Sequence, residues 1–162
     1  MVTGRAPHKE IEDEPGGEVR LEMARLAADD EDGVEASELE VTRDEVSYSY
    51  RTLELLHEQV PESELYFLMG ADMAAGLADW KEPERVVELA RIGVVPRPGV
   101  GMGAVDSALG RLGASDGAEI IDMPPCGASS TTVRQRVREG RPLRHLVPDP
   151  VIRLIEERRL YR

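Results

Sequence analysis

The chain has 162 residues, of which 41% are hydrophobic and 32% are charged, and this balance predicts one globular domain spanning residues 1–162. Its net charge of −12 argues against a nucleic-acid-binding protein, which needs a basic face. Cys126 is the only cysteine, which excludes a disulfide framework and a cysteine-based metal site. No signal-peptide core follows Met1 and no apolar run reaches membrane-spanning length, so a cytoplasmic protein without membrane association is expected.

The first half of the chain contains two predicted helices and two predicted strands. Residues 1–3 are interpreted as the end of a strand, and apolar residues at near-helical spacing predict a helix over 19–27. Loose alternation predicts a strand over 34–41. A second helix is expected over 50–59, and Pro61 ends it.

The second half alternates strands with helices. Residues 65–69 are apolar throughout, which is typical of a strand buried on both faces of a parallel sheet. The remaining predicted elements are a helix from Pro83, a strand at 92–95, a helix at 105–112, a strand at 120–123, and helices after Ser129 and Asp149. This order predicts an α/β domain with a doubly wound, mostly parallel sheet.

Three groups of polar residues follow predicted strands. They are residues 3–9, the sequence Gly70-Ala-Asp72, and residues 129–134. Ligands of doubly wound folds bind outside the carboxyl ends of the strands. We therefore expect the three groups to meet at one edge of the sheet.

The segment beginning at Ser129 combines a helix start with basic side chains. A hydroxyl of Ser129 or Ser130 can cap the first turn, and the free N–H groups there favour an anion. Arg134 and Arg138 are four residues apart and project from the same face of the helix. This pattern predicts either a phosphate site or an ordinary capped amphipathic helix.

Each of the other candidates has a structural as well as a functional interpretation. Gly70 either allows a ligand close to the backbone or forms a turn, and Asp72 either accepts a hydrogen bond from a ribose or caps a helix. Trp80, the only tryptophan, either stacks on a planar ligand or packs beside the core. Tyr48 and Ser49 either cap the following helix or contact a ligand.

Several familiar sites are missing from the sequence. There is no Gly-x-x-x-x-Gly-Lys-Ser/Thr loop, no His-Glu-x-x-His and no Gly-x-Ser-x-Gly, which argues against a P-loop enzyme, a zinc site and a hydrolase nucleophile. His8 and Lys9 supply two potential cations, or they belong to a surface loop.

Six motifs occur in order along the chain. They are Gly-Arg-Ala-Pro-His-Lys at 4–9 with Arg20-Leu-Glu-Met-Ala-Arg-Leu26, Ser47-Tyr-Ser-Tyr-Arg-Thr-Leu53, Glu64-Leu-Tyr-Phe-Leu-Met-Gly-Ala-Asp72 with Trp80, Val94-Val-Pro-Arg-Pro-Gly99, Ser129-Ser-Thr-Thr-Val-Arg134, and Leu146-Val-Pro148 through Leu160-Tyr161. Together they resemble bacterial nicotinate-nucleotide adenylyltransferases over essentially the whole chain. The resemblance implies a Rossmann-like nucleotidyltransferase fold and an enzyme of NAD biosynthesis. Such an enzyme transfers the adenylyl group of ATP, bound with Mg²⁺, to nicotinate mononucleotide and releases pyrophosphate.

The resemblance also implies binding residues for both substrates. Those for ATP are His8, Lys9, Gly70, Asp72, Ser129, Ser130, Thr131 and Arg134. Those for nicotinate mononucleotide are Tyr48, Ser49, Asp72 and Trp80, with the Trp80 ring stacked on the pyridine.

One family motif is absent. The family begins with a strand and a Gly-x-Phe-Asp-Pro-x-His-x-Gly-His loop, whereas this sequence has three histidines and no His-x-Gly-His. By this resemblance we expect that a first strand–helix unit of roughly 30 residues is missing. We also expect no catalytic residue in this chain and little adenylyl transfer by these 162 residues. The alternatives are a non-catalytic nucleotide-binding protein and an adenylyltransferase for another phosphate acceptor, and a homo-oligomer is compatible with each.

Overall fold

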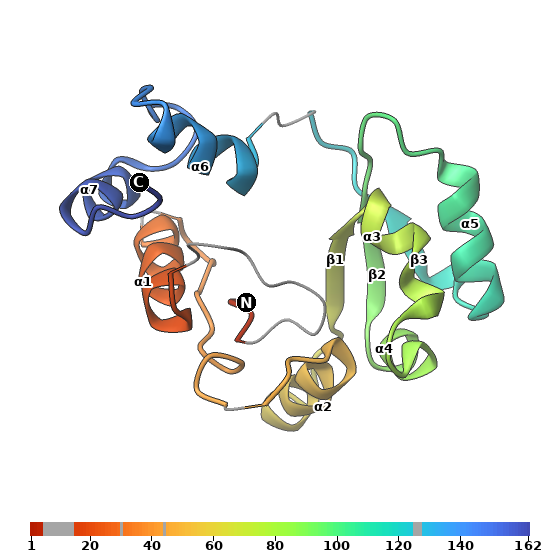
Figure 1. Ribbon diagram of the computed structural model, residues 1–162. Helices are drawn as coiled ribbons and strands as arrows, with labels where there is room; N and C mark the ends of the chain where they lie inside the picture. The colour runs from red at the N-terminus through yellow and green to blue at the C-terminus, as the bar shows by residue number, and fades with distance from the viewer. Residues whose placement is uncertain (5–14, 30, 44, 125–127) are drawn as a thin grey trace. The chain divides into compact units, whose positions relative to one another are not determined.

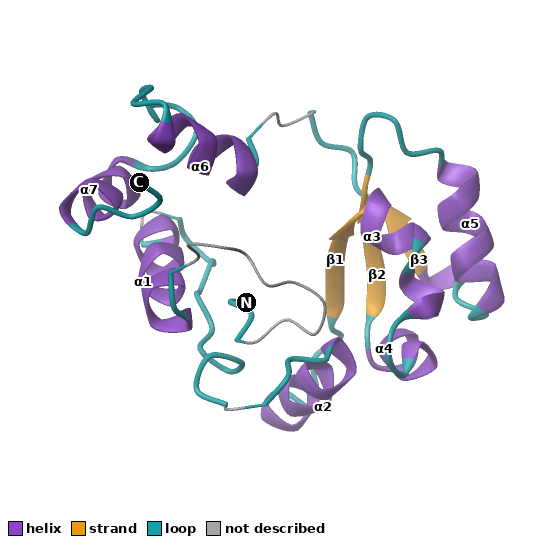
Figure 2. Cartoon of the chain, in the orientation of Figure 1, coloured by secondary structure: helices purple, strands orange, loops and turns teal. Residues whose placement is uncertain are grey.

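The computed structural model describes residues 1–4, 15–29, 31–43, 45–124 and 128–162. These residues group into two compact units, drawn in Figures 1 and 2. The first unit is Met1–Ser47 with Gly127–Arg162, and the second is Tyr48–Cys126. The single domain expected from the sequence stays a prediction.

A parallel sheet of three strands forms the centre of the second unit (Figure 2). The strands β1 (Tyr66–Gly70), β2 (Arg91–Val95) and β3 (Ala118–Ile120) lie in that order across the sheet. Helices connect them, as parallel strands require. This arrangement confirms the predicted α/β class, although β3 begins and ends earlier than predicted.

One face of the sheet carries the hydrophobic core of the second unit. The elements that cover it are α2 (Ser49–Gln59), α3 (Ala71–Ala75), the 3₁₀ turn η1 (Leu77–Asp79), α4 (Pro83–Leu89) and α5 (Met102–Arg111), with a second 3₁₀ turn η2 (Ser115–Gly117) before β3. Ile92 and Val94 of β2 are almost fully buried against Leu77 and Val86. Alternate residues of a strand point to opposite faces, so these two side chains mark the covered face.

The other face of the sheet, among the described residues, exposes apolar side chains of β1. Tyr66 is 44% and Leu68 is 59% exposed, whereas Met69 is 7% exposed. The prediction of a strand buried on both faces is therefore wrong for residues 65–69. A continuous apolar run predicts a strand, but whether both of its faces are covered depends on elements elsewhere in the chain.

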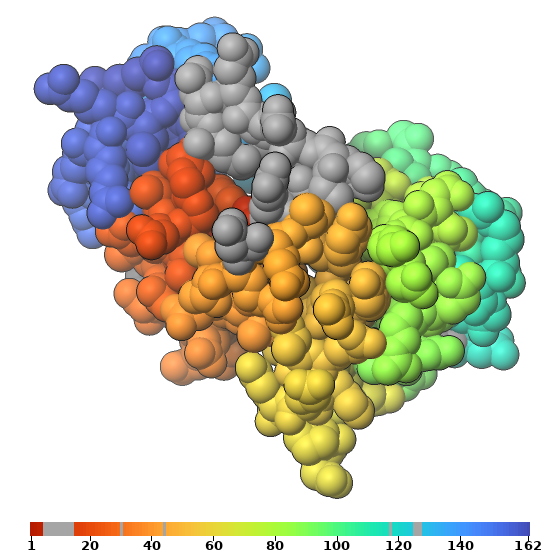
Figure 3. All heavy atoms as spheres, turned by 60° about the horizontal axis from the view of Figure 1, so that its bottom comes forward, coloured from red at the N-terminus to blue at the C-terminus, as the bar shows by residue number. Residues whose placement is uncertain are grey.

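The C-terminal end of α2 and the residues that follow it are exposed on the surface of the second unit. Residues 57–64 are all exposed, and they stand out in Figure 3 as the yellow spheres. On the same helix, Thr52 and Leu53 are buried, so α2 packs through its N-terminal half.

The first unit contains α1 (Gly17–Ala28), α6 (Ser130–Arg138) and α7 (Asp149–Glu157). Val133, Val151 and Ile155 are its buried centre. Gly140 follows α6 with a φ of +65°, a left-handed conformation that glycine adopts without strain. Among the described residues, no helix is long and apolar enough to cross a bilayer.

Two strands predicted for the first unit are wrong. Residues 38–42 form a turn in which the Glu38 carbonyl accepts hydrogen bonds from the N–H groups of Val41 and Thr42. Residues 1–3 lie outside any strand, and the Arg20 guanidinium donates to the carbonyls of Thr3, at 2.6 Å, and Gly4, at 2.9 Å. Local turn and side-chain hydrogen bonds satisfy backbone groups that strand pairing would otherwise use.

Candidate functional site

Asp72 and Arg97 meet at the carboxyl ends of two neighbouring strands. Gly70 ends β1 and is paired in register with Val95, which ends β2. Asp72 lies in the first turn of α3 directly after β1, and its Oδ1 lies 3.3 Å from the Nε of Arg97. Both side chains are about half exposed, so a ligand can reach the pair.

Gly70 has extended backbone angles, φ −69° and ψ 152°, so it is no left-handed turn residue. A Cβ at this position would lie 2.5 Å from Asp72 Oδ1 and 2.8 Å from Arg97 Nε. A side chain here would therefore displace the ion pair. The N-cap residue of α3 is Gly70 itself, without a side-chain cap, so Asp72 does not cap the helix.

Trp80 lies directly after η1 and is half buried. Its ring meets the ring of Phe67 edge to face, with centroids 6.2 Å apart, and it packs against the core of the second unit. This contact agrees with the interpretation as a residue beside the core. The half-buried ring can still offer part of its surface to a ligand.

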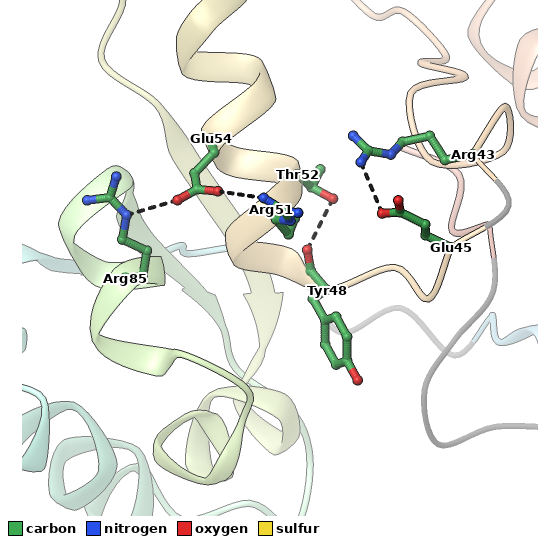
Figure 4. Close-up of polar contacts among 7 residues, drawn as sticks. All are labelled: Arg43, Glu45, Tyr48, Arg51, Thr52, Glu54 and Arg85. Carbon is green, nitrogen blue, oxygen red and sulfur yellow. Dashed lines mark hydrogen bonds and ion pairs between the residues drawn. The ribbon is translucent and has the colours of Figure 1, made fainter.

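Tyr48 and Ser49 begin α2 without capping it by a side chain. The Tyr48 carbonyl accepts hydrogen bonds from the backbone N–H and the hydroxyl of Thr52, the second of which Figure 4 shows. The Tyr48 ring stacks on Tyr50 with centroids 6.1 Å apart. Both residues therefore sit at a fixed helix start.

An ion-pair network fastens α2 to α4 on the surface of the second unit (Figure 4). The Glu54 carboxylate lies 3.2 Å from Arg85 Nε and 3.9 Å from Arg51 Nη1. Hydrogen bonds to Glu88 and Glu54 raise the pKa of the Arg85 guanidinium. Every side chain of this network forms an ion pair with another side chain of the network, so we interpret the network as structural.

Ser129 is the N-cap of α6. Its Oγ accepts a hydrogen bond from the Thr132 N–H at 3.1 Å and lies 2.9 Å from the Thr132 hydroxyl. The sequence-based prediction of a cap is thus confirmed for Ser129. Ser130 and Thr131 are exposed at the start of the helix, and Arg134 is half buried one turn later.

A cavity of about 340 Å³ lies beside this helix start, within the first unit. Its polar lining is Ser129, Ser130 and Arg134. The rest of the lining is apolar or aromatic and consists of Met23, Ala128, Val133, Leu146, Val147, Val151, Ile155 and Tyr161. A phosphate next to an apolar base would suit such a lining, since ligand pockets combine an apolar wall with a few polar groups.

Replacing Ser129 with alanine is expected to lower the free energy of unfolding by about 1 kcal/mol, because the Thr132 N–H loses its acceptor. Denaturant titration measures the loss. Ser130→Ala is the matched control, since it removes a hydroxyl from the first helical residue, where alanine is a good helix former. Equal losses in the two variants would contradict the assignment of the cap.

Comparison with known proteins agrees with this fold and these motifs. A family model described as cytidylyltransferase-like matches residues 1–136. A probable nicotinate-nucleotide adenylyltransferase of Roseiflexus sp. (strain RS-1) is 45% identical over 148 residues, which cover 90% of this chain and 72% of that protein. The chain belongs to the nicotinate-nucleotide adenylyltransferase family. A further relative of the same name, from Desulfitobacterium hafniense (strain DSM 10664 / DCB-2), is 36% identical over 168 residues, covering 100% of this chain and 79% of that protein.

Two solved structures are similar to this chain in fold. The nicotinic acid mononucleotide adenylyltransferase of Plasmodium falciparum, complexed with NaAD, matches with a TM-score of 0.73 and 17% identity over 98% of this chain and 78% of that chain. Its complex with APC matches with a TM-score of 0.69 and 18% identity, over 90% and 76%. The predicted Rossmann-like nucleotidyltransferase fold and the transferase family are thus confirmed.

The binding residues expected of a nicotinate-nucleotide adenylyltransferase fall into three sets. Tyr48, Ser49, Gly70, Asp72 and Trp80 lie in the second unit, and Ser129 to Arg134 lie in the first. His8 and Lys9 lie outside the described residues. That the residues of all three sets meet at one edge of the sheet stays a prediction.

Arg97 is not among the binding residues predicted from the sequence. A signal for it was present, because Arg97 lies two residues beyond the second of two predicted neighbouring strands, within the motif at 94–99. Among residues the structure describes, no group of three or more histidine, cysteine, aspartate or glutamate side chains could hold a metal ion.

Proposed function

We propose that this protein transfers the adenylyl group of ATP to nicotinate mononucleotide, giving nicotinate adenine dinucleotide and pyrophosphate. The observation that carries the proposal is 45% identity over 90% of the chain to a relative named for this activity. The Plasmodium falciparum structures, complexed with NaAD and with APC, lend support through their fold. A cytoplasmic location and a homo-oligomeric state stay predictions.

The reaction is a displacement at phosphorus. An oxygen of the nicotinate mononucleotide phosphate attacks the α-phosphorus of ATP, and the bond between that phosphorus and the α–β bridging oxygen breaks as pyrophosphate leaves. Such a transfer depends on aligning the two phosphates and compensating their charge, and it needs no covalent nucleophile on the protein.

Residues of the first unit are assigned to the phosphates of ATP. Ser130 and Thr131 offer hydroxyl and N–H groups at the start of α6, where the helix dipole favours an anion. The Arg134 guanidinium can bind phosphate oxygens through two parallel hydrogen bonds. Ser129 holds the first turn in place through its cap. His8 and Lys9 remain proposed as further cations.

Residues of the second unit are assigned to the nucleosides. Asp72 accepts hydrogen bonds from ribose hydroxyls above the Gly70 backbone, and Trp80 stacks on the pyridine ring. Tyr48 and Ser49 are placed near the nicotinate end. We treat Mg²⁺ as a companion of ATP, because this ion usually binds through substrate phosphates and one or two carboxylates.

The test combines binding with transfer. Calorimetry with the 162-residue chain measures binding of ATP and nicotinate mononucleotide, and a coupled assay measures pyrophosphate release. The assay is run on this chain and on the chain preceded by a relative's segment containing Gly-x-Phe-Asp-Pro-x-His-x-Gly-His. We expect binding by both proteins and ready transfer only by the longer one. Faster transfer to a pantetheine phosphate than to nicotinate mononucleotide, or binding without any transfer by the longer protein, would overturn the proposal.

A further inference from the structure

The pair formed by Asp72 and Arg97 is placed where it can act on a ligand and contributes little to stability. The side chain of Arg97 is 57% exposed and that of Asp72 is 50% exposed. Ion pairs this exposed add little to the free energy of unfolding, because water screens the charges. The pair nevertheless lies at the carboxyl ends of two neighbouring strands, where ligands of such sheets bind, which points to a role other than stability.

The backbone of Arg97 is fixed by the turn that follows it. The Arg97 carbonyl accepts a hydrogen bond from the Val100 N–H at 3.2 Å, with Pro98 and Gly99 between them. Gly99 has a φ of +85°, and a proline followed by a left-handed glycine is typical of a type II turn. Pro98 also restricts Arg97 to extended conformations. The turn therefore fixes the backbone position from which the Arg97 side chain extends.

The position of Asp72 is fixed by the end of β1 and the first turn of α3. It lies two residues after β1, in the first turn of α3, and its carboxylate lies over the bare backbone of Gly70. Any Cβ at Gly70 would come within 3 Å of both partners, at 2.5 Å from Asp72 Oδ1 and 2.8 Å from Arg97 Nε. The three residues are thus close neighbours at the strand ends.

We propose that Arg97 is a positioning residue for nucleotide binding: it holds the Asp72 carboxylate over Gly70 and neutralises the charge of that carboxylate against incoming phosphates. The inference rests on the proposed function, in which Asp72 accepts hydrogen bonds from ribose. Both substrates are anions and the chain carries a net charge of −12, so an uncompensated carboxylate at the site would repel them. Arg97 removes this repulsion and leaves oxygens of Asp72 free to accept hydrogen bonds.

The experiment measures nucleotide affinity by calorimetry in the 162-residue chain. Arg97→Ala is expected to weaken binding of the substrate that Asp72 contacts by about 10-fold, which corresponds to 1.4 kcal/mol. Arg97→Lys should retain most of the affinity, because it keeps the positive charge. Thermal unfolding should be nearly unchanged in both variants. Arg111→Ala is the matched control, since Arg111 has a similar exposure of 59% and pairs with Asp79 at 3.9 Å in the same unit.

A double variant separates neutralisation from direct contact. If Arg97 acts through Asp72, the variant Arg97→Ala with Asp72→Asn should bind more tightly than Arg97→Ala alone, since the repelling charge is gone. If Arg97 instead binds the nucleotide itself, the second change should weaken binding further, and the inference is overturned. Wild-type affinity in Arg97→Ala also overturns it, while the proposed function stands. A wild-type chain that binds neither nucleotide overturns both.

Discussion

Replacing Leu77 with alanine is expected to lower the free energy of unfolding by about 2–5 kcal/mol. Leu77 lies in η1 between α3 and α4, and none of its surface is exposed. The other buried residues of its core come from six different elements and cannot all move into the space that the lost methyl groups leave. Denaturant titration followed by circular dichroism measures the loss.

Leu68→Ala is the matched control, because it makes the same chemical change in the same unit. Leu68 is 59% exposed on the open face of the sheet, so we expect a loss below about 1 kcal/mol. Equal losses in the two variants would mean that the face carrying Leu68 is covered in solution. That result would contradict the assignment of Leu68 to an open face of the sheet.

The sequence predicted the elements whose signals are local. The helix after Ser129 follows from a capping serine and a glycine at Gly140, and the structure places α6 between them. Pro83 likewise predicts the start of α4. These signals act within a few residues of the element, so they can be recognised without knowing what packs against it.

Features that depend on distant partners were not predictable in the same way. Residues 34–41 alternate like a strand, yet the described residues place no strand there, because pairing requires a neighbouring strand edge. The burial of β1 depends equally on what covers each face of the sheet. The pairing of Asp72 with Arg97 depends on the register of β1 and β2, which bring together residues that lie 25 positions apart in the chain.

The candidate site was predictable mainly through whole motifs. Gly70 and Asp72 are common residues in turns and caps, and singly they favour no ligand. Their place in the sequence Leu-Met-Gly-Ala-Asp, followed by Trp80, forms one of the motifs that resemble the family. The structure adds that a Cβ at Gly70 would lie 2.5 Å from Asp72 Oδ1 and 2.8 Å from Arg97 Nε, so a side chain there would displace this ion pair.

Replacing Arg134 with alanine is expected to weaken ATP binding by about 10- to 100-fold, the largest functional effect that we predict. Arg134 lines the cavity beside the start of α6 together with Ser129 and Ser130. Hydrogen bonds from a guanidinium to phosphate are stronger than those between neutral groups, and partial burial reduces their screening by salt. Calorimetry with ATP at two salt concentrations measures the affinity.

Two further variants show whether the geometry of Arg134 matters as well as its charge. Arg134→Lys keeps the charge but loses the planar fork, so we expect an affinity between those of the wild type and Arg134→Ala. Arg138→Ala, one turn further along α6 and exposed, should bind ATP almost as the wild type does. If Arg138→Ala lost more affinity than Arg134→Ala, the anion would bind near the end of α6. The dipole there disfavours an anion, so such a result would require the basic side chains alone to hold the phosphates.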